Sequence, residues 1–160
     1  NFHQKYELTR MKLQKIIFYV YVQHLIENNG EPFFQDILEA WLYGPVLPNL
    51  YLKLLHQRNY PLTQIAEGKA SKLTPGHQQL ITKIVNQYGP YTPRQLVNKT
   101  CREEPWKINF LDADWSCNLI SDADLYQFYA KQTTNQNKRS QSENKLSDFI
   151  NHFLFIFHYE

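Results

Sequence analysis

Apolar residues recur at helical spacing near the start of the chain. One stripe comprises Leu13, Ile16, Ile17, Val20, Tyr21, His24 and Leu25. Other apolar residues cover much of the opposite side, and a helix that is apolar on nearly every face is usually buried. Thr9 is placed to cap this helix, and Gly30, after two asparagines, is placed to end it in a left-handed conformation. We therefore predict a central helix between these two residues.

Capping residues and prolines at helix starts predict four further helices. Pro48 begins one of them. A Thr-Pro pair opens the helices predicted at 75–88 and 93–101, and Ser121 caps a helix over 122–131. Proline at the first helical position loses no needed hydrogen bond, and the preceding threonine can accept one from the first turn.

The remaining segments are less regular. "PFFQDILEAWLY" is compatible with a short strand or a helical turn, and "REEPWKINFLDADWSCNLI" is predicted to be irregular. "KQTTNQNKRSQSENK" has no large apolar residue, which is typical of a linker. We predict a mainly α fold: a single compact helical domain with a few short β-strands over 1–131, a polar linker over 132–145, and a C-terminal apolar helix or partner-binding element over 146–160.

Composition narrows the class of protein. A hydrophobic share of 42% and an aromatic share of 15% favour a packed core over disorder. The formal net charge of +2 is too small to indicate nucleic acid or an anionic membrane surface. No apolar run reaches the ~18 residues of a membrane span. We expect a cytoplasmic protein whose two cysteines, Cys101 and Cys117, are reduced thiols.

Candidate catalytic and metal-binding chemistry is sparse. The sequence has no Gly-rich phosphate loop, Gly-x-Ser-x-Gly or His-Glu-x-x-His motif. Two Asp-x-Asp pairs, Asp112/Asp114 and Asp122/Asp124, could contribute to a Mg²⁺ or Ca²⁺ site, but the glycine and distal glutamate of a calcium loop are not in place. The second pair is explained by a helix start. We expect no enzyme activity, cofactor or metal.

The two Thr-Pro helices also have the outline of a helix-turn-helix. Base and phosphate contacts would then come from the start of the second helix. It offers Arg94, Gln95, Asn98 and Lys99, without a basic stripe behind them. A DNA-binding regulator therefore stays an alternative, although we do not expect nucleic acid as the main partner.

A specific block of residues, 39–51, runs from the segment after the first predicted helix into the second. "LQKIIFYVYVQHL", followed by "EAWLYGPVLPNLY", resembles the Panacea domain family of SocA-like, GepA-type antitoxin domains from bacteria and their phages. The block contains the family's pattern residues Glu39, Ala40, Trp41, Tyr43, Gly44, Pro45, Val46, Pro48 and Tyr51. Further along, Tyr88-Gly89, Leu96 and Trp106 continue the pattern, while Cys101 stands where the family has histidine.

The resemblance implies a non-enzymatic antitoxin that binds and neutralises a cognate toxin protein. One kind of family member acts as an adaptor that delivers its toxin to a bacterial protease. The alternative that the resemblance leaves open is a phage- or prophage-borne protein that inhibits a host defence factor, and a homodimer also stays open. No catalytic residue is implied.

The residues that could contact a partner fall into two groups. Trp41 and Tyr43 either anchor a structural corner against the first helix or form a partner-binding hot spot, and we favour the scaffold interpretation for the whole motif, Trp106 included. Recognition would then fall to the C-terminal element. Its candidate residues are Phe149, Phe153, Leu154, Phe155 and Phe157.

Deletion of residues 132–160 is expected to leave a folded domain and to abolish partner binding. Circular dichroism would report the fold and calorimetric titration the affinity. An unchanged affinity would instead direct attention to Trp41 and Tyr43.

Overall fold

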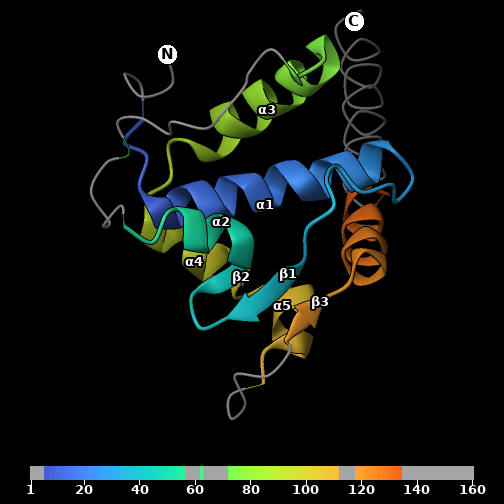
Figure 1. The fold of residues 1–160 in the computed structure, drawn as a ribbon. Coiled ribbons are helices and arrows are strands. Elements are labelled where there is room, and N and C mark those ends of the chain that lie inside the picture. The colour runs from blue at the N-terminus through green and yellow to red at the C-terminus, as the bar shows by residue number, and fades with distance from the viewer. Residues whose placement is uncertain (1–5, 57–61, 63–71, 112–117, 135–160) are drawn as a thin grey trace, which may run out of the picture. The chain divides into compact units, whose positions relative to one another are not determined.

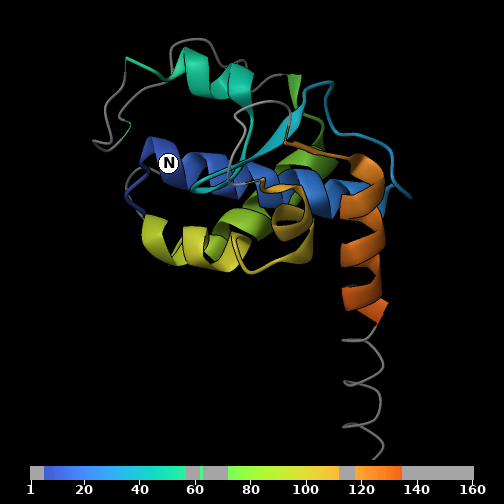
Figure 2. The same cartoon turned by 90° about the horizontal axis from the view of Figure 1, so that it is seen from below.

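A long central helix organises the fold. The computed structural model describes residues 6–56, 62, 72–111 and 118–134. The chain divides into two units, 1–126 and 127–160. In the first unit, α1 (Arg10–Glu27) contacts α2 (Pro48–Lys53), α3 (Pro75–Tyr88) and α4 (Pro93–Thr100) (Figure 1). A second view shows α2 and α4 on opposite sides of α1 (Figure 2). The mainly α fold class is thus confirmed.

Helix α1 begins and ends where the sequence predicts. The hydroxyl of Thr9 accepts the backbone N–H of Lys12, and positive φ angles of 54° at Asn29 and 91° at Gly30 turn the chain away after the helix. Its buried residues surround the helix axis, as predicted for a central helix. They also include three polar residues that the hydrophobic pattern does not predict: Lys12, Gln14 and Lys15.

The other predicted helix starts are confirmed as well. Thr74 accepts the backbone N–H of His77, and Thr92 forms a complete capping box with Gln95. Ser121 accepts the backbone N–H of Asp124 at the start of a helix over 122–134. That helix continues three residues into the segment predicted as a linker.

The small sheet resolves the ambiguous segments. Strands β1 (Leu38–Trp41), β2 (Gly44–Val46) and β3 (Leu119–Ile120) form one antiparallel sheet in the order β2-β1-β3. Helix α5 (Glu104–Asn109) packs on β1 and β3. The prediction of irregular structure after residue 101 was therefore wrong in part, because a six-residue helix and a two-residue strand are too short to show a period.

Strand register explains the proline in β2. Ala40 donates its backbone N–H to the backbone oxygen of Asn118, so its polar backbone groups face β3. Pro45, which lies opposite Ala40, therefore makes no ladder hydrogen bond to β1. The missing N–H of Pro45 falls on the outer edge of the sheet, which is where a strand tolerates proline.

The hairpin between β1 and β2 turns through Leu42 and Tyr43. Neither residue has a positive φ, and Gly44 takes a φ of 90° in their place. A Cβ atom on Gly44 would lie 2.5 Å from Oγ1 of Thr100 and 3.0 Å from Cε of Lys15. Glycine is therefore required here both by backbone conformation and by the close approach of α1 and α4.

Replacing Gly44 by alanine is expected to lower the free energy of unfolding by about 2–4 kcal/mol, because the variant combines a left-handed alanine with an overpacked contact. Urea denaturation measures the change. Gly76→Ala is the matched control: its added Cβ would meet only Oγ1 of Thr74, at 3.8 Å. This control should stay within about 1 kcal/mol of the wild type, and equal losses in the two variants would contradict the argument.

Candidate functional site

The segment that follows β2 is held by a side-chain amide from α1. Oε1 of Gln14 accepts the backbone N–H of Leu47 at 3.0 Å, and Nε2 donates to the backbone oxygen of Leu47 at 3.2 Å. Gln14 is 4% exposed and Leu47 is 2% exposed. Because buried backbone groups require partners, Gln14 takes the place of a neighbouring strand.

A buried lysine holds the strand itself. Nζ of Lys15 donates to the backbone oxygen of Pro45 at 2.6 Å, and Lys15 is 1% exposed. Burial lowers the pKa of Lys15 to about 7, and the neighbouring Cys101 offsets a part of this effect. Near neutral pH the amine can therefore exchange its proton while it keeps a donor for Pro45.

Trp41 is fixed by contacts at both ends. Its Nε1 donates to the carboxylate of Glu39 at 2.6 Å, and its backbone oxygen accepts from Nε1 of Trp106 at 2.8 Å. Its ring meets that of Tyr51 edge to face, with centroids 5.0 Å apart. The guanidinium of Arg10 lies 5.0 Å from the centroid of Tyr51. The indole of Trp41 thus has a defined position on the outer face of the hairpin.

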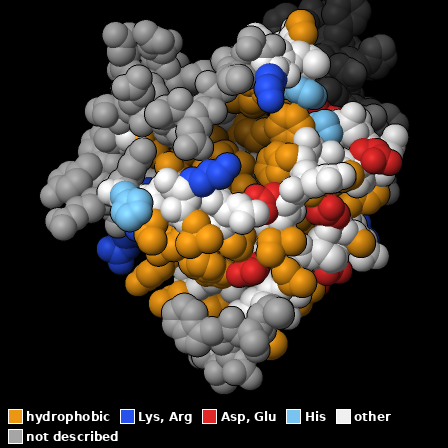
Figure 3. Space-filling view, viewed as in Figure 1, with side chains coloured by type: hydrophobic (Ala, Val, Ile, Leu, Met, Phe, Trp, Pro, Cys, Tyr) orange, Lys and Arg blue, Asp and Glu red, His pale blue; other side chains and the backbone are white. Residues whose placement is uncertain are grey.

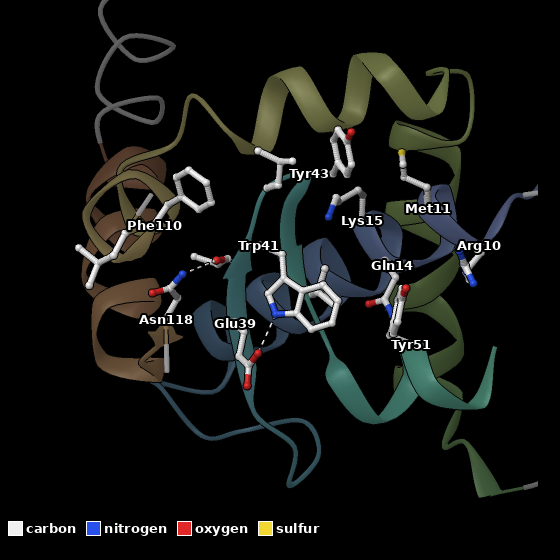
Figure 4. A pocket seen from close by; sticks show the side chains of 14 residues that line it. Arg10, Met11, Gln14, Lys15, Glu39, Trp41, Tyr43, Tyr51, Phe110 and Asn118 are labelled. Atoms are coloured by element: carbon white, nitrogen blue, oxygen red, sulfur yellow. Dashed lines mark hydrogen bonds between the residues drawn. The ribbon is translucent and has the colours of Figure 1, made fainter. Parts of the chain in front are cut away.

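These residues surround a cavity of about 540 Å³. Figure 4 shows Trp41 in the middle, with Arg10 and Tyr51 toward one end and Asn118 and Phe110 toward the other. The lining residues are Arg10, Met11, Gln14, Lys15, Glu39, Ala40, Trp41, Leu42, Tyr43, Val46, Tyr51, Phe110, Leu111 and Asn118. The cavity therefore combines aromatic walls with a few polar groups, which is the usual make-up of a binding pocket.

Part of the cavity lining is open to solvent. Leu42, Tyr43 and Leu111 are 60%, 59% and 61% exposed. We call these three residues the apolar rim. Apolar side chains gather over the hairpin on the face shown in Figure 3. The site is thus a pocket whose apolar surface continues outward.

One buried polar atom in the lining has no hydrogen-bond partner. Nδ2 of Asn118 donates to the backbone oxygen of Ala40 at 3.1 Å, whereas Oδ1 of the same side chain is buried and accepts no hydrogen bond. A buried acceptor without a donor costs about 1–3 kcal/mol. This unsatisfied acceptor therefore lies inside the domain, out of reach of a molecule in the cavity.

The structure brings most of the predicted motif residues together. Glu39, Trp41, Tyr43 and Tyr51 line the cavity. Gly44 and Pro45 are buried on the strand behind them, Pro48 begins α2, and Trp106 contacts the backbone of Trp41. Tyr43 lies exposed at the hairpin tip. The C-terminal candidates Phe149, Phe153, Leu154, Phe155 and Phe157 lie outside the described residues.

Sequence reasoning missed part of the lining. Phe110, Leu111 and Asn118 come from the segment predicted to be irregular, and no local pattern links them to the hairpin. Gln14 and Lys15 did carry a signal, because two adjacent polar residues within an otherwise apolar helix must either reach solvent or find buried partners.

The helix-turn-helix alternative receives little support. Helices α3 and α4 contact each other less than either contacts α1. Of the four residues proposed to contact DNA, Gln95 is used in its own capping box and Lys99 forms an ion pair with Glu103 at 3.3 Å. Arg94 and Asn98 are exposed. Two of the four residues proposed to contact DNA therefore already have partners within the domain.

The other candidate chemistry is accounted for locally. Burial raises the pKa of the Cys101 thiol, which is the opposite of activation as a nucleophile. Asp122 accepts the hydroxyl of Tyr21 at 2.8 Å, and Asp124 accepts that of Ser121 at 2.7 Å. Asp112, Asp114 and Cys117 lie outside the described residues.

Two kinds of feature are absent from the described part of the chain. No three His, Cys, Asp or Glu residues there lie close enough together to hold a metal ion. No helix there has the length and apolar character needed to cross a membrane.

Burial of Lys15 predicts a pH-dependent stability. The pKa of Lys15 is about 7 in the folded chain against an ordinary value of 10.5, so between these values the unfolded chain holds a proton that the folded chain has released. The free energy of unfolding therefore rises with pH above about 7, by at most about 1.4 kcal/mol per pH unit from this group. Below the folded pKa both states are protonated and the contribution is constant.

Lys15→Met should remove this dependence. Urea denaturation of both proteins from about pH 6 to about pH 8.5 measures the difference in stability, wild type minus variant, which should increase with pH. Both proteins retain Cys101, whose pKa burial raises, so most of its own contribution cancels in this difference. Parallel stability curves would show that Lys15 is not desolvated as described.

Comparison with known proteins identifies the family. The family model described as antitoxin SocA-like, Panacea domain, matches residues 13–107, which is more than half of the chain. No curated protein and no solved structure matches. The matched range contains most of α1 and all of the hairpin, α2, α3 and α4. The chain belongs to the SocA-like antitoxin family with a Panacea domain.

Proposed function

We propose that this protein is a non-enzymatic antitoxin that binds and neutralises a cognate toxin protein. The observation that carries the proposal is the family match over residues 13–107. Neutralisation proceeds either by direct obstruction of the toxin or by its delivery to a protease. Both routes begin with protein–protein contact.

The cavity and its apolar rim supply a surface for that contact. Exposed apolar side chains that cluster around a concave site are typical of interaction surfaces, and Trp and Tyr are enriched among residues that dominate binding energy. Leu42 and Tyr43 occupy a two-residue turn fixed by Gly44. The tip is therefore preorganised, which lowers the entropic cost of binding.

Within the motif we propose a division of roles. Gly44 and Pro45 are buried and hold the hairpin against α1, so they act as scaffold. Tyr43 is largely exposed and Trp41 is half-buried beside it, so these rings are available to a partner. The motif then contains both scaffold residues and partner-binding residues.

The C-terminal segment with Phe149, Phe153, Leu154, Phe155 and Phe157 is a second candidate interface. Together with Ile150 and Ile156 these residues make seven apolar side chains within nine residues, an apolar stretch suited to a groove on a partner. The deletion of residues 132–160 tests this interface separately from the rim.

A growth assay tests both the function and the rim. The protein is co-expressed with the product of the adjacent gene, and growth should be restored only if that product is toxic and bound. The Leu42→Asp/Tyr43→Asp double variant should lose rescue and bind at least tenfold more weakly, because charged side chains oppose burial of the rim. Calorimetric titration gives the affinities.

Leu52→Asp is the matched control, because Leu52 is 61% exposed but does not line the cavity. It should retain rescue, and both variants should keep the wild-type melting temperature. A harmless or unbound neighbour would refute the antitoxin function. Rescue that persists in a protease-deficient host would favour obstruction over delivery.

A further inference from the structure

The amino end of α3 is held on α1 by a contact between three rings. His24, in the last turn of α1, stacks on Phe33 with ring centroids 4.6 Å apart. His77, in the first turn of α3, meets Phe33 edge to face at 4.8 Å and lies 6.0 Å from His24, again between ring centroids. All three residues are half-buried. The contact therefore joins α1, the loop that follows it and α3.

His77 is the side chain through which the first turn of α3 makes this contact. Within residues 74–79 it alone is half-buried, and the other five residues are exposed. The buried residues of α3 begin about one turn further on, with Leu80, and continue with Ile84. Loss of the His77 contact would therefore free the first turn while the rest of α3 stays packed.

The two imidazoles are packed as neutral rings. The backbone oxygen of His24 accepts from the side chain of Asn28, and the backbone N–H of His77 donates to Thr74. Within the described ranges, neither imidazole forms a hydrogen bond or an ion pair of its own. The rings contribute packing to the contact, and a proton on either of them adds a charge that no hydrogen bond there stabilises.

The surrounding charges can accommodate one proton better than two. Burial lowers the pKa of His24, and a charge on His77 lowers it further, whereas Glu27 raises it. The carboxylate of Glu27 is shared with Lys83 of α3, at 3.2 Å. An imidazolium at His24 still benefits from the carboxyl end of α1 and from the face of Phe33. A second one, at His77, would meet both that charge and the positive end of α3.

We infer that the His24–Phe33–His77 contact is a pH-sensitive switch: when both imidazoles are protonated, the first turn of α3 leaves Phe33 and α1. Histidine suits this role because its ordinary pKa of about 6.5 places the change of charge within mild acidification. The switch acts on the amino end of α3 alone, since Leu80 and Ile84 keep the remainder of the helix buried. It does not depend on the identity of any partner.

The first test follows the full chain by NMR from about pH 7.5 to about pH 5. Nuclear Overhauser contacts between the rings of Phe33 and His77 are expected at neutral pH. They should disappear once the signals of His24 and His77 show that both are protonated, whereas contacts of Leu80 with α1 should persist. Ring contacts that survive double protonation would overturn the inference. Simultaneous loss of every α3 contact would indicate unfolding of the domain and would overturn it as well.

His77→Phe tests whether charge causes the release. This variant keeps a ring against Phe33 but cannot be protonated there, so the contact at position 77 should persist at about pH 5. His56→Phe is the matched control, because His56 is exposed. It should release the first turn of α3 at the same pH as the wild type. Release in His77→Phe to the wild-type extent would show that the charge of His77 is not responsible.

A further measurement does not depend on release of the helix. His77→Gln removes the second charge and should raise the pH at which His24 is half protonated, by roughly half a pH unit. Salt screens repulsion between charges but does not alter burial, so this difference from the wild type should shrink between about 0.02 M and about 0.5 M salt. An unchanged midpoint for His24, or a difference that does not respond to salt, would contradict charge coupling between the two rings.

Discussion

The rest of the site depends on the hydrogen bonds that Gln14 and Lys15 of α1 form with the backbone of β2 and of the residue that follows it. Gln14 satisfies both backbone groups of Leu47, and Lys15 satisfies the backbone oxygen of Pro45. These backbone groups lie in the core, where no water replaces a lost partner. The hairpin therefore has one position relative to α1.

Buried polar contacts of this kind specify geometry more than they add stability. Desolvation of an amine or an amide offsets much of the energy that its hydrogen bonds return, whereas loss of one partner leaves the other buried and unsatisfied. Lys15 illustrates the balance, because burial lowers its pKa to about 7 even though it is hydrogen-bonded. The close approach of Gly44 to Thr100 and Lys15 fixes the same segment sterically.

The cavity follows from this arrangement. With the outer edge of β2 held by side chains of α1, the turn projects beyond the core and exposes Leu42 and Tyr43. Trp41, fixed through Glu39 and Trp106, forms the middle of the cavity wall. A rigid concave surface of this kind leaves little ordering to be done on binding.

The sequence by itself determined the elements whose signals are local. Thr9, Thr74 and Thr92 cap helices within three residues of themselves, and Gly30 ends the central helix at its own position. The apolar faces of α1 likewise predicted its central place. The family pattern in the hairpin could also be recognised from the sequence, because it consists of specific residue types at consecutive positions.

Only the tertiary structure decided which contacts form between segments that are far apart in the sequence. Burial of Lys15 depends on a carbonyl thirty residues away, and β3 exists only because β1 pairs with it. The cavity needs Phe110 and Asn118 from a segment without periodicity. A sequence pattern records what a residue favours locally, whereas a buried polar group or a two-residue strand is stable only through partners that the fold brings to it.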